Sequence, residues 1–406
     1  MINTIKHGLW TFDYDTKKSN IYSTNLEMYD DFSFKYNNDS IINKYDGNKQ
    51  YLTEYDLNDF RRAANIHKIA RNTAKKYLIT GGKIADLVDN VYDIILKLCK
   101  LDGNTYFING APYDNFCGIA FPVGVNINNV VAHDSKTFLL DDDRTFCLGD
   151  VVKIDIGVHV NGRIIDSAFT HIITNSDNVN NGTSMNEDNL YFNLLEASRE
   201  SMINAIKMAS PDQNLLEMSE TINEIIESYE ISIGNDILPI YSVKGIGGHN
   251  IEHYKIHANK MILSFPDSEI QKSMRMEEDE VYAIETFATT GTGELTQETD
   301  ATKYTHFIEN KDVNDIKKKE KKQFEKFELY NWLQKTRRGL PFCSEWLEKT
   351  KIPKLEKSFK LGVNSGQIMI YPPLYDIKGS VVSQFEHTIH VKDGSAIEIF
   401  SLSSDY

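Results

Sequence analysis

Residues 150–170 read DVVKIDIGVHVNGRIIDSAFT, and no other stretch of the sequence says as much about the fold. Two runs with many β-branched residues flank Asn161-Gly162, the dipeptide most typical of a two-residue β-hairpin turn of type I′. Such a turn places Val160 opposite Arg163 and fixes the pairing of every residue before and after them. The sequence therefore predicts a long antiparallel hairpin over about residues 151–173.

Two aspartates of this hairpin share one face. The predicted pairing sets Gly157 opposite Asp166, and because side chains alternate faces along a strand, Asp155 and Asp166 become diagonal neighbours roughly 7–8 Å apart. Two buried carboxylates cannot both stay ionised without a counter-charge, which a metal ion, an arginine or a proton could supply. The alternative is that one aspartate lies at a fraying hairpin end and contacts only water. This alternative carries weight because an isolated pair of aspartates is a weak motif.

The rest of the chain predicts a mixture of helices and largely antiparallel strands, an α+β fold. Apolar periodicity predicts helices at about 56–78, 84–98, 190–208 and 214–229, and a solvated helix with one apolar side at 317–334. Strand-like runs lie at 117–125, 281–287 and 381–391. Residues 1–50 lack periodicity and predict a poorly ordered leader with a short docked segment at about 9–14, followed by a catalytic domain over 51–406.

Composition narrows the class of protein. The chain has 406 residues, is 41% hydrophobic and carries a formal net charge of −15. An acidic balance argues against a nucleic-acid partner, which needs a basic face, and against attachment to an anionic membrane surface. No run of 18 apolar residues and no secretory signal pattern occurs, so we expect a cytoplasmic protein.

Four cysteines are scattered along the chain without a CxxC pair: Cys99, Cys117, Cys147 and Cys343. This spacing fits neither a zinc knuckle nor a dense disulfide framework. We therefore expect four reduced, partly buried thiols, as in an intracellular protein.

Three further residues of the kind that bind metals stand out. His249 follows the flexible pair Gly247-Gly248, and Glu285 and Glu386 interrupt otherwise apolar, strand-like runs. A carboxylate in such a run either turns to solvent on an edge or is held by a cation. Four carboxylates and one imidazole would suit moderately hard divalent ions.

These residues and their flanks resemble the type 2 methionine aminopeptidases, metallopeptidases with the "pita-bread" fold. The match covers about residues 55–406. The resemblance implies a metal-ligand set in the family's order: Asp155, Asp166, His249, Glu285 and Glu386. It also implies two divalent ions per chain, of Co, Mn, Fe or Zn, and removal of the initiator methionine from nascent polypeptides with a small second residue.

The same resemblance assigns roles beyond the ligands. It implies that His133 and His257 hydrogen-bond the scissile amide and the developing charge, and that Glu285 moves the proton. A methionine pocket is expected from Phe121, Ile256, His257, Tyr371 and His133. For Phe121 and Ile256, ordinary core packing is the alternative reading.

The type 2 assignment rests on the long interval between the last two ligands. About 100 residues separate Glu285 from Glu386, and a Lys/Glu-rich helical stretch occupies much of them. This stretch resembles the helical subdomain insertion of type 2 enzymes, expected here over about 305–370. Tyr371-Pro372-Pro373-Leu374 matches the end of that insertion.

Two other functions fit a pita-bread fold. One is a catalytically dead relative that binds RNA or proteins, but such relatives lose metal ligands and tend to carry basic surfaces. The other is a peptidase acting on X-Pro bonds, which the insertion and the flank of Phe121–His133 disfavour. A monomer is the family expectation, and the leader has no polybasic block of the kind tied to ribosome association.

Overall fold

The computed structural model describes residues 45–46, 49–50, 52–101, 106–108, 111–113, 117–137, 142–174, 189–233, 236–310, 318–392 and 397–401. The chain divides into two units, Met1–Thr53 and Glu54–Tyr406. In the first unit, β1 (Tyr45–Asp46) pairs antiparallel with β2 (Lys49–Gln50). The rest of the predicted leader, including the docked segment at 9–14, lies outside the described residues, so both stay predictions.

The predicted hairpin is confirmed residue by residue. Strand β8 (Val151–Val160) pairs with β9 (Arg163–Ile172), and Val160 lies opposite Arg163 as the turn requires. Asn161 and Gly162 both adopt positive φ, 50° and 76°, which is the backbone that a type I′ turn demands. Every residue of β9 except one is buried, so the register is fixed by packing on both faces.

Two antiparallel sheets form the centre of the second unit. The first contains β5 (Cys117–Ile119), β8 and β6 (Gly124–Ile127), with β9 on β8. The second has six strands: β12 (Tyr241–Ser242), β13 (Gly247–Ile251), β14 (Met261–Leu263), β15 (Val281–Thr289), β20 (Val382–Val391) and β21 (Ile397–Ile399). Long, largely buried strands form the middle of each sheet, β8 and β9 in the first and β15 and β20 in the second.

The sheets meet where β9 lies beside β20, and hydroxyl groups join them. Thr388 Oγ1 donates to the Asp166 carbonyl oxygen at 2.6 Å and accepts from the Asp166 N–H at 2.8 Å. Ser167 Oγ donates to the carbonyl oxygen of Glu386 at 2.7 Å. We call the contacts of Thr388 and Ser167 the hydroxyl seam. Because it bonds the backbone of Asp166 and of Glu386, it fixes two predicted metal ligands relative to each other.

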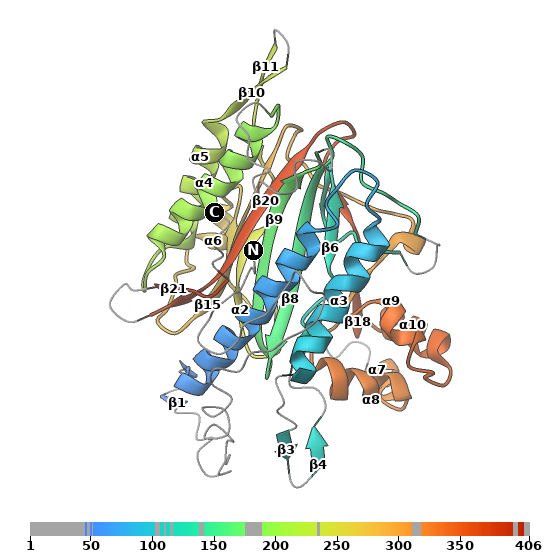
Figure 1. Ribbon diagram of the computed structural model, residues 1–406. Helices are drawn as coiled ribbons and strands as arrows, with labels where there is room; N and C mark the ends of the chain where they lie inside the picture. Colours follow the sequence, from blue (N-terminus) through green and yellow to red (C-terminus); the bar gives the residue numbers. More distant parts are fainter. Residues whose placement is uncertain are drawn as a thin grey trace. The chain divides into compact units, whose positions relative to one another are not determined.

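Two helix pairs cover the sheets (Figure 1). Helices α2 (Glu54–Lys75) and α3 (Ile84–Leu101) lie along the first sheet, with α2 packed on β8 and β9. Helices α4 (Phe192–Met208) and α5 (Leu215–Glu227) cover the second, with α4 packed on β15 and β20. All four helices lie close to their predicted ranges.

The helical insertion has its own small core. It opens with β17 (His306–Glu309) and closes with β18 (Ile368–Tyr371), which pair antiparallel. Between them lie α7 (Lys318–Phe324), α8 (Glu328–Trp332), a π-helical turn at Leu333–Arg337, α9 (Ser344–Glu348) and α10 (Leu355–Asn364).

The single helix predicted at 317–334 is wrong, because the chain breaks between α7 and α8. Phe324 and Leu329 are both fully buried in the insertion core. Residues five apart do not share one face of a continuous helix, so a break is needed to turn both side chains inward.

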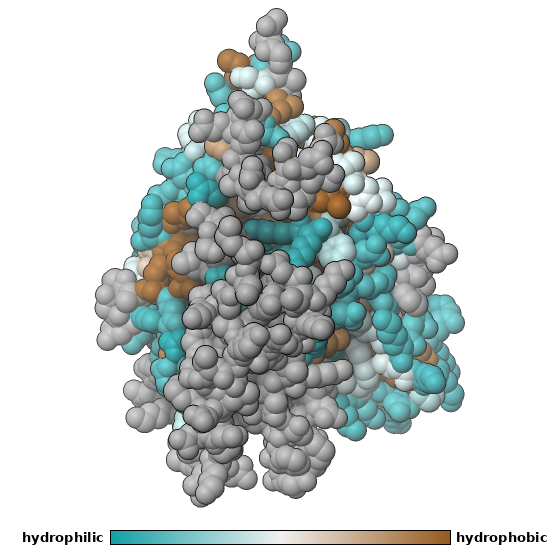
Figure 2. Space-filling view, in the orientation of Figure 1, coloured by the Kyte–Doolittle hydropathy of each residue, from teal (hydrophilic) through white to brown (hydrophobic). Residues whose placement is uncertain are grey.

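Smaller elements complete the described chain. They are β3 (Tyr106–Ile108), β4 (Ala111–Tyr113), β7 (Val130–Ala132), β10 (Glu230–Ile233), β11 (Asp236–Pro239), α6 (Ser268–Gln271), β16 (Thr296–Gln297), a 3₁₀ turn at Ala301–Lys303 and β19 (Leu374–Tyr375). The hairpin β10–β11 exposes Ile237 and Leu238, and Figure 2 shows the apolar surface on it in brown. Among the described residues, no helix is both long and apolar enough to span a bilayer.

The expectation of four reduced cysteines is wrong for two of them. Cys99, near the end of α3, forms a disulfide with Cys117 at the start of β5, and their Cα atoms lie 5.3 Å apart. Sequence spacing could not show this pair, because tertiary packing of α3 on β5 brings the two residues together. Cys147 and Cys343 remain free, the first exposed and the second buried.

This pairing predicts the thiol count. Under denaturing conditions without reductant, we expect two reactive thiols per chain, from Cys147 and Cys343, and four after reduction. Titration with a thiol reagent, followed by peptide mapping, measures both. Four thiols in protein kept from reductant throughout would contradict the Cys99–Cys117 bond.

Candidate metal centre and active site

The five predicted ligands lie on five strands that face one another. Asp155 is on β8, Asp166 on β9, His249 on β13, Glu285 on β15 and Glu386 on β20. The register explains their proximity within each sheet: Gly157 lies opposite Asp166, Glu285 lies directly opposite Glu386, and His249 pairs with Ala283. The alternative of a fraying hairpin end is thereby excluded, because β8 and β9 pair along their full length.

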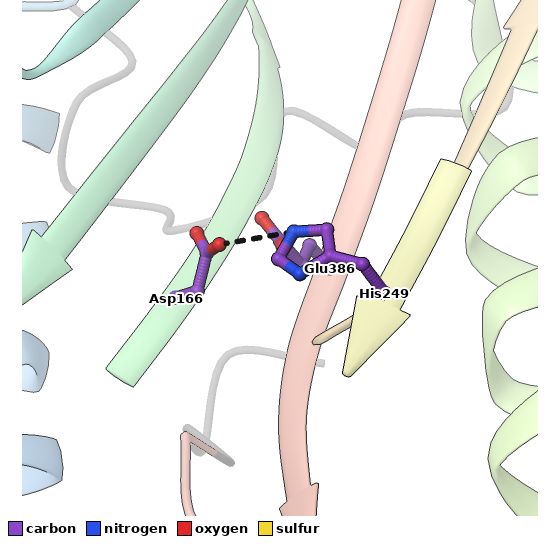
Figure 3. Close-up of side chains that lie close together, drawn as sticks. All are labelled: Asp166, His249 and Glu386. Atoms are coloured by element: carbon purple, nitrogen blue, oxygen red, sulfur yellow. Dashed lines mark ion pairs between the residues drawn. The ribbon is translucent and has the colours of Figure 1, made fainter. Parts of the chain in front are cut away.

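Asp166, His249 and Glu386 form the tightest group, and their ligand atoms all lie within 4.8 Å of one another. Figure 3 shows the three side chains pointing toward a common point. His249 Nε2 lies 3.5 Å from Asp166 Oδ2 and 3.9 Å from Glu285 Oε1. Asp155 belongs to the same group, because burial and, after it, the negative charge of Asp155 raise the pKa of Asp166.

Burial dominates the electrostatics of the cluster. It raises the pKa of Asp155 to about 7, and it raises the pKa values of Asp166 and Glu386 well above the usual range for carboxyl groups. The pKa of Glu285 is raised for the same reason, with repulsion from Asp155 added. Lys153 on β8 is a buried cation, but its Nζ donates to the Asn128 carbonyl oxygen, at 2.7 Å, and not to a carboxylate of the cluster.

Several buried atoms of the cluster have no hydrogen-bond partner within the described part of the chain. They are Asp155 Oδ1, Asp166 Oδ1, Glu386 Oε2 and His249 Nδ1. Unpartnered buried carboxylate oxygens are costly, and divalent cations satisfy such oxygens directly. The donor set therefore fits divalent metal ions.

A second layer of side chains borders the cluster. The ring of His257 lies 4.2 Å from that of His249 and 6.0 Å from that of Tyr371, measured between centroids. The ring of His133 lies 5.3 Å from that of Tyr371. Burial lowers the pKa of both His133 and His257 to about 4, so both imidazoles are neutral at physiological pH.

Phe121 and Ile256, the two residues with an ordinary core reading, are both buried, at 7% and 3% exposure. The Phe121 ring lies over Gly157 in the middle of β8, so closely that a Cβ atom on Gly157 would come within 2.2 Å of Phe121 Cε1. The glycine opposite Asp166 thus makes room for an aromatic ring beside the carboxylates.

Two residues of this region are missed by sequence reasoning. Gln384 Nε2 donates to Glu285 Oε2 at 3.0 Å, and its position two residues before Glu386 on a strand was an available signal. His306 lies with its ring 5.7 Å from that of His133, and its Nε2–H donates to the Pro122 carbonyl oxygen at 3.0 Å. No local pattern marks His306, because β17 enters the insertion far from the other site residues in sequence.

Comparison with known proteins agrees with this geometry. The model of metallopeptidase family M24 matches residues 58–313. Methionine aminopeptidase 2-1 of Ajellomyces capsulatus is 33% identical over 362 residues, which cover 88% of this chain and 74% of the relative. Methionine aminopeptidase 2 of Schizosaccharomyces pombe is also 33% identical, over 358 residues and 75% of its length.

Solved structures share the fold at low sequence identity. A methionine aminopeptidase from Thermotoga maritima matches with a TM-score of 0.53 and 17% identity, over 87% of this chain and 99% of that one. A thermophilic Arx1 matches with a TM-score of 0.68 and 14% identity, over 87% of this chain and 92% of that one.

The fold and the carboxylate–histidine cluster together define a pita-bread metallopeptidase, a hydrolase that uses divalent metal. More narrowly, the chain belongs to metallopeptidase family M24 and, within it, to the methionine aminopeptidases of type 2.

The raised pKa values predict how the metal-free protein responds to pH. Carboxyl groups that hold protons near neutrality must release them to bind a cation, so we expect Mn²⁺ binding to release protons and to weaken as the pH falls below about 7. Isothermal titration calorimetry in two buffers of different ionisation enthalpy measures both effects. Binding without proton release, at constant affinity from pH 6 to 8, would contradict the raised values.

A second prediction concerns Gly157. We expect Gly157→Ala to lower the free energy of unfolding by about 1–3 kcal/mol, because its methyl group would overlap the Phe121 ring. Gly118→Ala on the neighbouring strand β5 is the matched control, since its Cβ would meet only His159 Nε2 at 3.5 Å, an ordinary contact. Chemical denaturation measures both variants. Equal stability of the two would show that Phe121 moves aside at no cost.

Proposed function

We propose that this chain removes the initiator methionine from nascent polypeptides whose second residue is small, using two divalent ions held by Asp155, Asp166, His249, Glu285 and Glu386. The observation that carries the proposal is the set of unpartnered carboxylate oxygens on Asp155, Asp166 and Glu386, buried on three different strands and grouped around His249. The curated relatives are methionine aminopeptidases by name, which fits the same chemistry.

A bound divalent ion would lower the pKa of a coordinated water and polarise the scissile carbonyl. Glu285 is the residue we propose to move the proton. Gln384 fixes the orientation of its carboxylate by bonding Oε2, which leaves Oε1 on the side of His249. A carboxylate held in this orientation is suited to accept a proton on Oε1 and to return it from the same atom.

The tautomer of His133 follows from its hydrogen bond. Because the Pro372 carbonyl oxygen can only accept, the 3.4 Å contact assigns the proton to His133 Nδ1 and leaves Nε2 as an acceptor. We propose that this nitrogen accepts from the scissile amide N–H, while His257 donates to the developing oxyanion. Neutral imidazoles fit these roles, since a positive ring would repel the substrate's terminal ammonium.

The methionine side chain needs an apolar pocket beside the cluster. We propose that Phe121, Ile256 and Tyr371, with the rings of His133 and His257, provide its walls, and we add His306, which contacts the His133 ring. Aromatic and histidine rings present polarisable faces to a thioether.

Other assignments stay predictions of this proposal. The ions could be Co, Mn, Fe or Zn, because oxygen and imidazole donors suit all four. A cytoplasmic location and a monomeric state are the family expectations, and substrate N-termini are the only partners proposed. A catalytically dead relative is disfavoured, because all five ligand-type side chains face one another.

The assay that tests the proposal is release of methionine from short peptides. Protein loaded with Mn²⁺ or Co²⁺ should release Met from Met-Gly and Met-Ala peptides and act poorly on peptides with a bulky second residue. Mass spectrometry of the products and a metal analysis belong together. If protein shown to hold two equivalents of metal releases no methionine, the proposed aminopeptidase activity is refuted.

Asp155→Asn should abolish turnover and leave the fold intact, because an amide keeps the shape of the carboxylate but loses its charge toward a cation. Asp93→Asn, at an exposed position of α3, is the matched control and should be fully active. Circular dichroism checks the fold of both variants. Wild-type turnover in Asp155→Asn would remove Asp155 from the metal site.

A further inference from the structure

Arg337 is a buried cation that the chemistry above leaves unused. It ends the π-helical turn of the insertion and is 8% exposed. Its guanidinium Nη2 donates to three backbone carbonyl oxygens, those of Ile119 at 3.0 Å, Ala120 at 2.8 Å and Pro341 at 2.6 Å. The Trp346 ring packs on the guanidinium, with Cζ 4.9 Å from the ring centroid.

Among the described residues, no carboxylate forms an ion pair with Arg337. Burial lowers the pKa of Arg337 to about 10, and nearby Cys343, Tyr92 and Tyr254 raise it, so the guanidinium stays charged at neutral pH. Burying a cation on carbonyl oxygens alone is costly, and an apolar side chain of similar size would fill the space more cheaply. This free-energy cost suggests that the carbonyl groups of Ile119, Ala120 and Pro341 must be held in one fixed arrangement.

Those carbonyl groups belong to the segment that carries Phe121. Ile119 ends β5, Ala120 follows, and the Ala120 N–H donates to the Gly157 carbonyl oxygen at 2.9 Å. Just beyond Phe121, the Pro122 carbonyl oxygen accepts from His306 Nε2 at 3.0 Å. The backbone on both sides of Phe121 is therefore held by side chains of the helical insertion.

Resting on the proposed function, we infer that Arg337 is a positioning residue for substrate selection: by holding the Ile119 and Ala120 carbonyl groups, it fixes the Phe121 ring as a wall of the methionine pocket. The insertion then sets which first residue is accepted, although it supplies none of the metal ligands. A lysine lacks the planar guanidinium that packs on the Trp346 ring, so it would hold these carbonyl groups less firmly.

The test is the selectivity between first residues, which is independent of the fraction of active protein. For Arg337→Met we expect the ratio of kcat/KM for Met-Ala against Leu-Ala peptides to fall about tenfold, mainly through KM for the methionine peptide, with a smaller fall for Arg337→Lys. Lys335→Met, on an exposed position of the same turn, should keep the wild-type ratio.

An unchanged ratio in Arg337→Met and Arg337→Lys, with kcat/KM lowered equally for both peptides, would overturn the inference and leave Arg337 as a link between insertion and sheet. Hydrogen exchange gives a readout that needs no activity. The Ala120 amide, bonded to Gly157, should exchange faster in Arg337→Met than in Lys335→Met, and equal exchange would also count against the inference. Wild-type protein that releases no methionine would refute the proposed function instead.

Discussion

The burial of four carboxyl groups in one cluster, with repulsion among them added, is the main physical constraint on this structure. Asp155, Asp166, Glu285 and Glu386 come from four strands and share one buried space, and burial raises all four pKa values. Such a cluster destabilises the core unless protons or cations neutralise it. The fold must therefore hold the strands together by means other than the carboxylates themselves.

The hydroxyl seam does this where the two sheets meet. Thr388 bonds both the N–H and the carbonyl group of Asp166, and Ser167 bonds the carbonyl group of Glu386. Neutral hydroxyl groups join the backbones of two acidic residues without adding charge, and they leave the carboxylates free to face the cluster. The seam thus fixes the backbone positions from which these two carboxylates reach the cluster.

The sequence predicts the structure correctly where a short local pattern determines how the residues around it pair. Asn161-Gly162 determines the turn, the turn determines the register, and the register places Asp155 and Asp166 on one face, so this half of the site follows from a single stretch of chain. The four long helices follow from apolar periodicity for the same reason. The Cys99–Cys117 bond, the break before α8 and the position of His306 beside His133 depend on contacts between elements, which no local pattern encodes.

Within the site, the residues proposed for the chemistry are placed by local strand geometry, whereas those proposed for selectivity are placed by contacts between elements. The metal-ligand candidates lie on regular strands, where a period of two residues dictates which side chains share a face. The wall proposed at Phe121 instead depends on backbone carbonyl groups that accept from His306 and Arg337 of the insertion, which lie 184 and 217 residues away in sequence. Backbone carbonyl groups are the same for every residue type, so the segment around Phe121 can keep its place while its side chains vary. A change in the insertion that redirects these two donors would alter the pocket and leave the carboxylate cluster as it is.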